Sequence, residues 1–336
     1  MAATTAYAQK QADGLSYFLP KTAVRMSVKV EKTTFKPGEL ADFSDLYFKT
    51  PAATKADTRY RIVGIDFSSE GLPDSDKKFT VAVDKKHSIL TVDCDRNGVL
   101  KAINDKAADA PQPKAFVPAR KSAPLNPRDF MSQDILAAGN LPKMAQLVAQ
   151  EIYDIRDSRN QLSRGEADNM PKDGAQLKLM FANLDTQERA LMQMFTGVTT
   201  TDTLEHVVTF VPEKGKASVP VFRFSKKFGL LTADDYSGAP YNVTVEDENV
   251  MPELPADANA AKKEKDDFQV GVNLPGKIKL TVLCGDKPVA SYETYAAQFG
   301  RVEMLNGALF GKKITSHLVL DPVTGSVVKL RTEPLE

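Results

Sequence analysis

Two arginines are the first candidates for chemistry in this chain. Arg156 and Arg159 lie three residues apart in a segment with helical spacing, so they share a helix face. Neighbouring guanidinium groups hold a carboxylate or phosphate through paired hydrogen bonds, which predicts an anion-binding site. The interpretation we favour is structural, with nearby carboxylates fixing the helix against its loop: Asp154, Asp157, Glu166 and Asp168.

A second motif has the start of a calcium loop. Asp93, Asp95, Asn97 and Gly98 follow the D-x-D-x-N-G pattern. The twelfth position is Asn104, where the loop requires a bidentate Glu, and the flanking segments alternate like strands. Asn-Gly between apolar strands is a strong hairpin signal, so a hairpin is the main prediction. Calcium is the alternative, and the sequence suggests no other cofactor.

Catalytic motifs are missing from the sequence. The three histidines, His87, His206 and His317, are far apart, and no G-x-S-x-G elbow, CxxC pair or Walker loop occurs. Carboxylates are plentiful, so a glycosidase-like pair assembled from distant residues would still suit a hydrolase. That hydrolase is the alternative to a non-enzymatic binding or structural module.

Composition limits the classes of protein further. The 336 residues carry 44 basic and 44 acidic side chains, a balance that argues against a nucleic-acid partner. No apolar run approaches the roughly 18 residues that a transmembrane helix needs. Cys94 and Cys284 each lie in an apolar, strand-like run, where they are either small buried side chains or a disulfide closing a long loop.

The elements that would position these residues begin with strands. Val24, Met26, Val28 and Val30 alternate with polar residues, which predicts a half-buried strand over 23–33. Further short strands are expected over 59–69, 79–83, 88–93 and 99–103, with a short helix over 39–47 and a turn over 71–76. This pattern is typical of an antiparallel sandwich or barrel.

The middle of the chain is expected to be helical. A proline-rich stretch, 105–129, predicts an extended linker or a strap on the surface. A helix should begin at Asn140 and Pro142 and end at Gly165. Asp173 and the residues after it should cap a second helical region, as one helix or two, which ends before Gly197.

Strands return after residue 198, with hairpins at Gly285-Asp286 and at 321–325. The predicted fold is α+β, with two mainly antiparallel, sandwich-like β units flanking a helical segment. The expected divisions are a leader over 1–13, a β domain over 14–104, the linker over 105–129, the helical segment over 130–197 and a second β domain over 198–336.

Several segments resemble a Bacteroidetes family of exported proteins of unknown function. They are Gly14–Ala23, Val28–Gly38, Glu151–Arg159, Gly165–Asp168, Pro171–Gly174 and Phe195–Gly197. The resemblance runs nearly end to end and carries no catalytic residue. It implies export, in agreement with Ala6-x-Ala8, a small-x-small signal-peptidase pattern before Gln9. It also implies an O-glycosylation triplet at Asp202-Thr203-Leu204, for which a plain surface threonine is the preferred interpretation.

These observations together predict a periplasmic or envelope-associated protein. Its function would be to bind an envelope protein or a glycan through loops and sheet edges.

Overall fold

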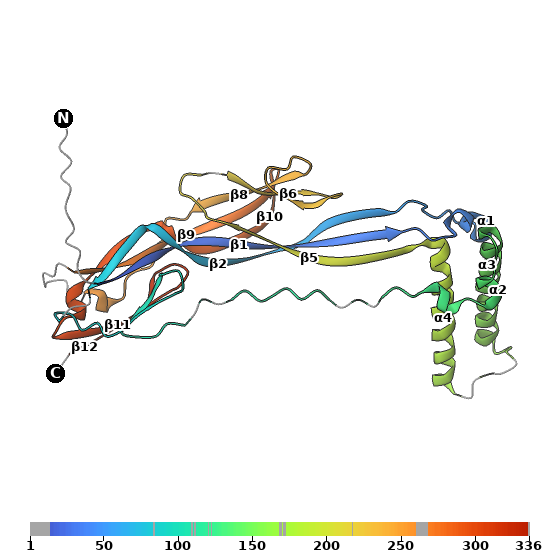
Figure 1. Cartoon of the computed structure of the whole chain (residues 1–336), viewed down its shortest axis with the longest axis horizontal. Helices are drawn as coiled ribbons and strands as arrows, with labels where there is room; N and C mark the ends of the chain where they lie inside the picture. The colour runs from blue at the N-terminus through green and yellow to red at the C-terminus, as the bar shows by residue number, and fades with distance from the viewer. Residues whose placement is uncertain are drawn as a thin grey trace.

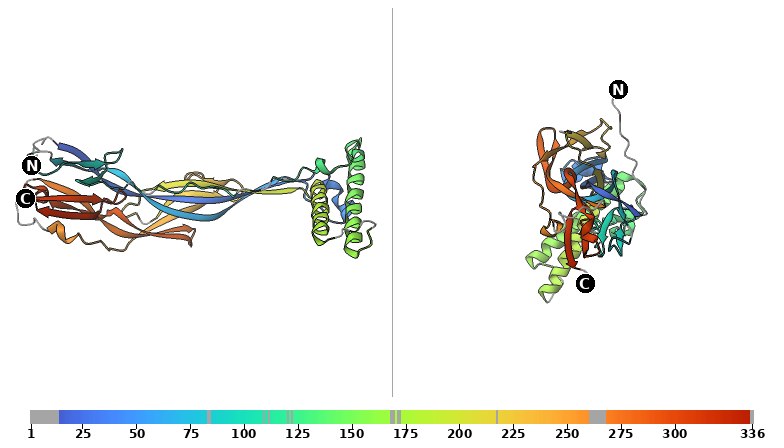
Figure 2. Two further views of the ribbon diagram at one scale, coloured as in Figure 1. Left: turned by 90° about the horizontal axis from the view of Figure 1, so that it is seen from below. Right: turned by 90° about the vertical axis from the view of Figure 1, so that its left-hand side faces the viewer.

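The computed structural model describes residues 14–334, apart from 83–84, 109, 111, 120, 122, 168–169, 171–172, 217 and 260–267. The molecule is elongated, with β-sheets gathered at one end and a helical unit at the other (Figures 1 and 2). We call the helical unit, residues 37–56 and 127–197, the head. The sheets, together with residues 14–30 and 62–82 of the two longest strands, form the body.

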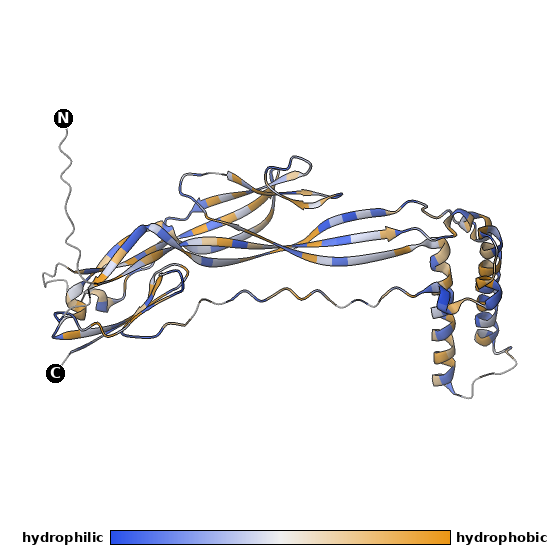
Figure 3. Ribbon diagram, in the orientation of Figure 1, coloured by the Kyte–Doolittle hydropathy of each residue, from blue (hydrophilic) through white to orange (hydrophobic). Residues whose placement is uncertain are grey.

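Two long strands run from the body to the head. β1 (Gly14–Lys36) pairs with β2 (Asp57–Ala82) on one side and with β5 (Val198–Phe210) on the other, all antiparallel. The alternation predicted over 23–33 is confirmed, because Val24, Met26, Val28 and Val30 are fully buried. Hydropathy alternates along these strands (Figure 3).

The turn predicted over 71–76 is wrong. β2 continues through this segment, with Gly71 opposite Thr22 and Pro73 opposite Pro20. The register then shifts between Phe18 and Pro20, so a bulge takes up the extra residues that the sequence signals as a turn. Gly71 is needed here because an added Cβ would lie 2.1 Å from the Pro322 carbonyl oxygen.

Between body and head the three strands form a ribbon that we call the stalk. It consists of residues 31–36, 57–61 and 198–203, in which Glu31 lies between Arg61 and Thr203. None of these residues is buried. The stalk therefore depends on its backbone ladder and on cross-strand pairs such as Arg61–Glu31, whose Nη2 and Oε1 atoms are 2.9 Å apart.

A five-stranded antiparallel sheet covers the body part of β1. Its order is β10-β9-β8-β6-β7, from the strands β6 (Ser218–Ser225), β7 (Gly229–Leu231), β8 (Ala239–Asp247), β9 (Gln269–Cys284) and β10 (Lys287–Asn306). Val24 and Met26 pack against Ile278 and Leu280 of this sheet. The contact gives the two-layer, sandwich-like packing that the alternating pattern predicted.

A four-stranded sheet closes the far end of the body. Its order is β12-β11-β4-β3, from β3 (Val92–Cys94), β4 (Leu100–Ile103), β11 (Ile314–Leu320) and β12 (Val327–Pro334), and the short helices η3 (Ala256–Asn259) and η4 (Gly307–Phe310) lie nearby. Ile103 pairs with Leu318. β4 precedes the helical segment and β11 follows it, yet they share this sheet. β1 and β5 share another sheet in the same way. The sheets therefore cross the domain divisions that were expected at residues 104 and 198.

The helices confirm the capping predictions. α3 (Leu141–Arg164) begins after Asn140, whose side chain accepts from the Lys143 N–H, and ends at Gly165. α4 (Gly174–Thr196) begins after Asp173 and runs as one helix to Gly197. The remaining head elements are η1 (Ala41–Phe43), α1 (Ser44–Phe48), η2 (Pro127–Phe130) and α2 (Gln133–Leu136).

The head has its own hydrophobic core. Leu40, Ile135, Ile152, Leu191 and Phe195 meet there at exposures of 0–1%. α3 and α4 lie side by side across the end of the stalk (Figures 1 and 2). Because Leu40 comes from the connection between β1 and β2, the long hairpin and the helices are held together by one core.

In the proline-rich segment, 104–126, the described residues run from the body to the head beside the stalk without regular structure (Figure 1). We call it the strap. Lys121 Nζ donates to the Thr201 carbonyl of β5, and Lys29 Nζ lies 5.9 Å from the centre of the Phe116 ring. These contacts correspond to the surface strap that the composition predicted.

Candidate binding pocket in the helical head

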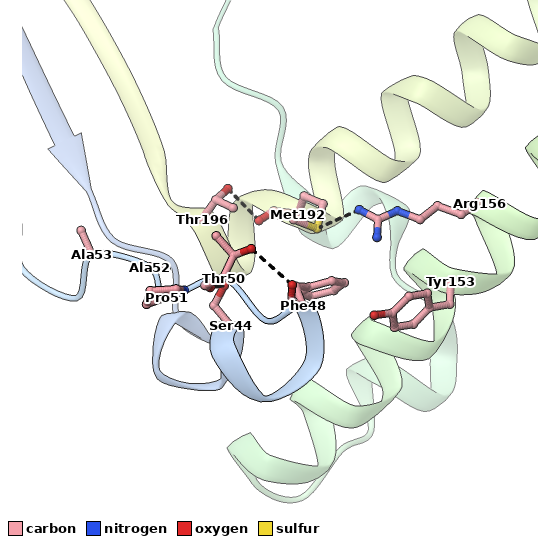
Figure 4. Close-up of a pocket in the computed structure, with 10 residues that line it drawn as sticks. All are labelled: Ser44, Phe48, Thr50, Pro51, Ala52, Ala53, Tyr153, Arg156, Met192 and Thr196. Atoms are coloured by element: carbon pink, nitrogen blue, oxygen red, sulfur yellow. Dashed lines mark hydrogen bonds between the residues drawn. The ribbon is translucent and has the colours of Figure 1, made fainter.

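A pocket of about 430 Å³ opens where the head joins the stalk (Figure 4). α1 and the loop after it form one wall, and α3 and the last turn of α4 form the others. Its lining residues are Ser44, Phe48, Thr50, Pro51, Ala52, Ala53, Tyr153, Arg156, Met192 and Thr196. Its volume is in the usual range for small-molecule sites.

Aromatic rings give the pocket its apolar side. The Phe48 and Tyr153 rings are stacked, with centroids 5.7 Å apart, and the Phe195 ring meets Phe48 edge-on at 4.9 Å. The Tyr153 hydroxyl donates to the Tyr47 carbonyl at 2.6 Å. This bond ties α3 to α1 and fixes the ring that faces the pocket.

Arg156 brings a positive charge to this aromatic surface. Its Nε donates to Glu188 Oε1 at 2.7 Å, and its Nη2 lies 3.9 Å from the Met192 sulfur. The guanidinium carbon is 5.5 Å from the Phe48 ring centre and 5.7 Å from that of Tyr153, within cation–π range. In Figure 4 the guanidinium group extends from α3 toward the space between Met192 and Phe48.

Arg159 does not line the pocket. Its Nη1 lies 3.2 Å from Asp185 Oδ1 and 3.8 Å from Glu188 Oε2. The carboxylates that pair with the two arginines therefore come from α4, whereas the sequence suggested neighbours in the chain. Asp168, one of those neighbours, lies outside the described residues.

Three hydroxyls complete the lining. Ser44 donates to the Thr50 carbonyl at 2.8 Å, Thr50 to the Phe48 carbonyl at 3.3 Å, and Thr196 to the Met192 carbonyl at 2.9 Å. Because their hydrogens are engaged, the exposed Thr50 and Thr196 present their oxygens as acceptors, whereas Ser44 is buried. No His, Asp or Glu lines it, so none of the three hydroxyls has a general base there. The arrangement is suited to holding a ligand.

Sequence reasoning missed most of this site. Arg156 was found, but Phe48, Thr50, Met192 and Thr196 were not. The aromatic run at Tyr47-Phe48 was an available signal, although nothing in the sequence shows that it packs against α3.

A second pocket, of about 420 Å³, lies between α3 and α4 away from the stalk. It is lined by Ser158, Gln161, Leu162, Ala167, Met180, Asn183 and Leu184, none of which is charged. It offers apolar contact and amide groups, without an electrostatic feature to orient a ligand.

The calcium-like motif forms the β3–β4 hairpin, as predicted. Asp95 Oδ1 accepts from the N–H groups of Asn97 and Val99, both at 2.8 Å, and Gly98 has φ +78°. Asp93 lies 3.4 Å from Lys101 Nζ. Within the described part of the chain no three His, Cys, Asp or Glu side chains gather as a metal site. Calcium binding by Asp93, Asp95 and Asn97 stays a prediction.

The other candidates for chemistry are dispersed. His206 lies on β5 and His317 on β11, where its Nδ1 is hydrogen-bonded to the Asn104 carbonyl, while His87 bridges to Gly311. Cys94 and Cys284 are unpaired and lie in different sheets. Burial raises the pKa of the Cys94 thiol, and nearby Asp93 and Asp95 act in the same direction, so the thiolate is disfavoured.

No described helix has an apolar stretch long enough to cross a membrane. A family model described as "Domain of unknown function (DUF4831)" matches residues 13–328. No curated protein and no solved structure matches the chain.

Proposed function

We propose that this chain, which belongs to the DUF4831 family, is an exported cell-envelope protein of Bacteroidetes that acts as a non-enzymatic binding module. The observation that carries the proposal is the place of the pocket. It lies in the head, at the end of the stalk farther from the sheets of the body (Figure 1). A stalk without buried residues adds little to a core, but it does separate a recognition unit from the rest of the molecule.

The surface of the head supports a binding role. Leu46 on α1 and Leu179 on α4 are 61% and 62% exposed. Leu46 lies between the pocket residues Ser44 and Phe48, and Leu179 lies next to Met180 of the second pocket, so both offer apolar contact to a partner. The partner would be an envelope protein or a glycan that meets this end of the molecule.

Export is supported by the sequence alone. Ala6-x-Ala8 before Gln9 has the residue sizes of a signal-peptidase site. Protein purified from its native cells should carry Gln9 as its first residue and fractionate with the envelope. A mature chain that keeps residues 1–8 in the cytoplasmic fraction would contradict this part of the proposal.

Site-specific photocrosslinking in native cells tests the binding role. A photoreactive phenylalanine analogue replaces Leu46 or Leu179 in the head and, as a matched control, Val328 in the body, which is 64% exposed. Discrete adducts are expected from the two head positions and not from Val328. Adducts from Val328 alone, or equal adducts from all three positions, would count against recognition by the head.

A glycosidase with paired carboxylates gains no specific support. Neither pocket is lined by Asp or Glu, and the hydrolase therefore stays an alternative to be tested by substrate turnover.

A further inference from the structure

We infer that the pocket lined by Arg156 binds the carboxylate of a ligand that also carries an apolar group and a hydrogen-bond donor. This inference rests on the proposed binding function and adds the chemical class of the ligand. A free organic acid or the C-terminus of a peptide would supply the same chemistry.

The charge of the lining points to an anion. Arg156 is the one charged side chain among the ten residues that line the pocket. Glu188 engages its Nε, and the contact between Nη2 and the Met192 sulfur is weak. Among the described residues no oxygen accepts from its Nη groups at hydrogen-bond distance, so these donors are left for a ligand. A carboxylate matches their geometry.

The position of Arg156 is fixed before any ligand arrives. Its Nε is held by Glu188 from α4, and its guanidinium group lies against the stacked rings of Phe48 and Tyr153. The Arg156 side chain is 38% exposed, so it is restrained and still reachable. A donor that is already oriented loses little conformational entropy when it binds.

The rest of the lining defines the body of the ligand. The oxygens of Thr50 and Thr196 can accept from a donor close to the carboxylate, such as a peptide N–H or an α-hydroxyl. Phe48 and the Pro51–Ala53 segment offer apolar contact. This combination corresponds to an N-acyl amino acid or a peptide that ends in an apolar residue.

Calorimetric titration with paired probes tests the inference. N-acetylphenylalanine should bind to the full-length protein, whereas the uncharged N-acetylphenylalaninamide should bind about tenfold more weakly or worse. Tetrapeptides ending in Phe, with a free or amidated C-terminus, show whether the peptide source is preferred. Acetate and inorganic phosphate show whether charge alone is enough. Equal binding of acid and amide, or no binding of either acid probe, would overturn the inference.

Two arginine variants provide a matched comparison. Arg156→Gln should lose binding of the acid probes by at least about tenfold. Arg159→Gln also removes a partner of Glu188 but leaves the lining intact, so its affinity should be unchanged. Equal loss in both variants would assign the effect to the ion-pair cluster and overturn the inference.

A third variant tests the same pocket without changing Arg156, and it serves if Arg156→Gln does not fold. Ala52→Leu places bulk in the pocket without touching an ion pair and should also abolish binding. Unchanged binding in Ala52→Leu would place the probe elsewhere. If head crosslinks persist in cells while all carboxylate probes fail, the ligand class is wrong and the binding function stands. If neither head crosslinks nor probe binding is observed, the proposed binding function is wrong.

Discussion

At the scale of single residues, Arg156 has two roles, and both depend on residues that are distant from it in the chain. It joins α3 to Glu188 of α4, and it supplies the positive charge of the head pocket. Glu188 is 32 positions away in the chain. The helical spacing of Arg156 and Arg159 was correctly seen as a shared face, but the residues facing them depend on how α4 packs.

Two tyrosines, the buried Tyr17 and the half-buried Tyr241, give a prediction of pH dependence. Burial raises the pKa of Tyr241 to about 12, with the hydrogen bond to Cys284 acting in the same direction, and burial also raises that of Tyr17. In the unfolded chain a tyrosine has a pKa of about 10. The stability that these neutral hydroxyls contribute is therefore fully present below pH 10, and the part due to Tyr241 is lost as the pH rises to about 12.

A near-ultraviolet absorbance titration checks this prediction. Tyr17 and Tyr241 should ionise only well above pH 10, and Tyr241→Phe should remove one late-titrating group. Ionisation of all nine in a single step near pH 10, before unfolding, would contradict it.

At the scale of elements, local signals determined where the helices begin and end. The two helices begin after the N-cap residues Asn140 and Asp173, as the sequence predicted. They end at the predicted glycines, Gly165 and Gly197. The two glycines nevertheless differ. Gly165 has φ +74° and ψ 22°, the left-handed helical region, whereas Gly197 has φ +78° and ψ −174°, a region that only glycine adopts readily.

We expect Gly197→Ala to destabilise the protein far more than Gly165→Ala. A Cβ on Gly197 would lie 2.4 Å from the Lys36 carbonyl oxygen, while one on Gly165 meets nothing within 4 Å. Gly165→Ala should lower the free energy of unfolding by about 1 kcal/mol, from backbone strain alone. Gly197→Ala should cost more than about 2 kcal/mol, because it adds a clash at the joint between α4, β1 and β5.

Urea denaturation of both variants measures the difference. Equal losses of stability would show that the joint at Gly197 can relax and that the contact with β1 is not a constraint.

At the scale of the whole molecule, the body and the head are joined by two connections, the three-stranded stalk and the strap. From Phe18 to Lys36, β1 spans about 60 Å at 3.3 Å per residue. The strap, residues 104–126, would span about 70 Å as a polyproline-type chain. This length is only slightly greater than the span of β1, so the strap must be nearly extended. Stalk and strap together should therefore resist bending more than the uncovered ribbon alone.

Lengthening the strap tests this stiffness. Inserting a short Gly-Ser segment between Ala107 and Ala108 should broaden the distribution of head-to-body distances. Double electron–electron resonance measures this distribution between spin labels on cysteines placed at Leu46 and Val328. The two native cysteines are removed as Cys94→Ala and Cys284→Ala.

The same insertion after Gly215, an open position in the β5–β6 loop, is the control and should leave the distribution unchanged. An unchanged distribution with the longer strap would show that the stalk is rigid without it.

The sequence by itself determined what depends on neighbours along the chain. Alternating residues such as Val24 and Val28 indicate a strand with one buried face, and Asn140 and Gly165 delimit a helix, because periodicity and capping act within a few residues. The α+β class, the β3–β4 hairpin and the strap could be predicted on this basis.

The tertiary structure decided what depends on partners distant in the chain. β4 pairs with β11 and β1 with β5, so the sheets do not follow the order of the sequence. The continuation of β2 through Gly71 depends on pairing with Thr22 of β1, and the extra residues of β2 form a bulge further on, between Pro73 and Lys78. The pocket exists only because α1, α3 and α4 converge at one end of the stalk. Pairing and packing are selected by burial over the whole chain, and no local pattern carries that information.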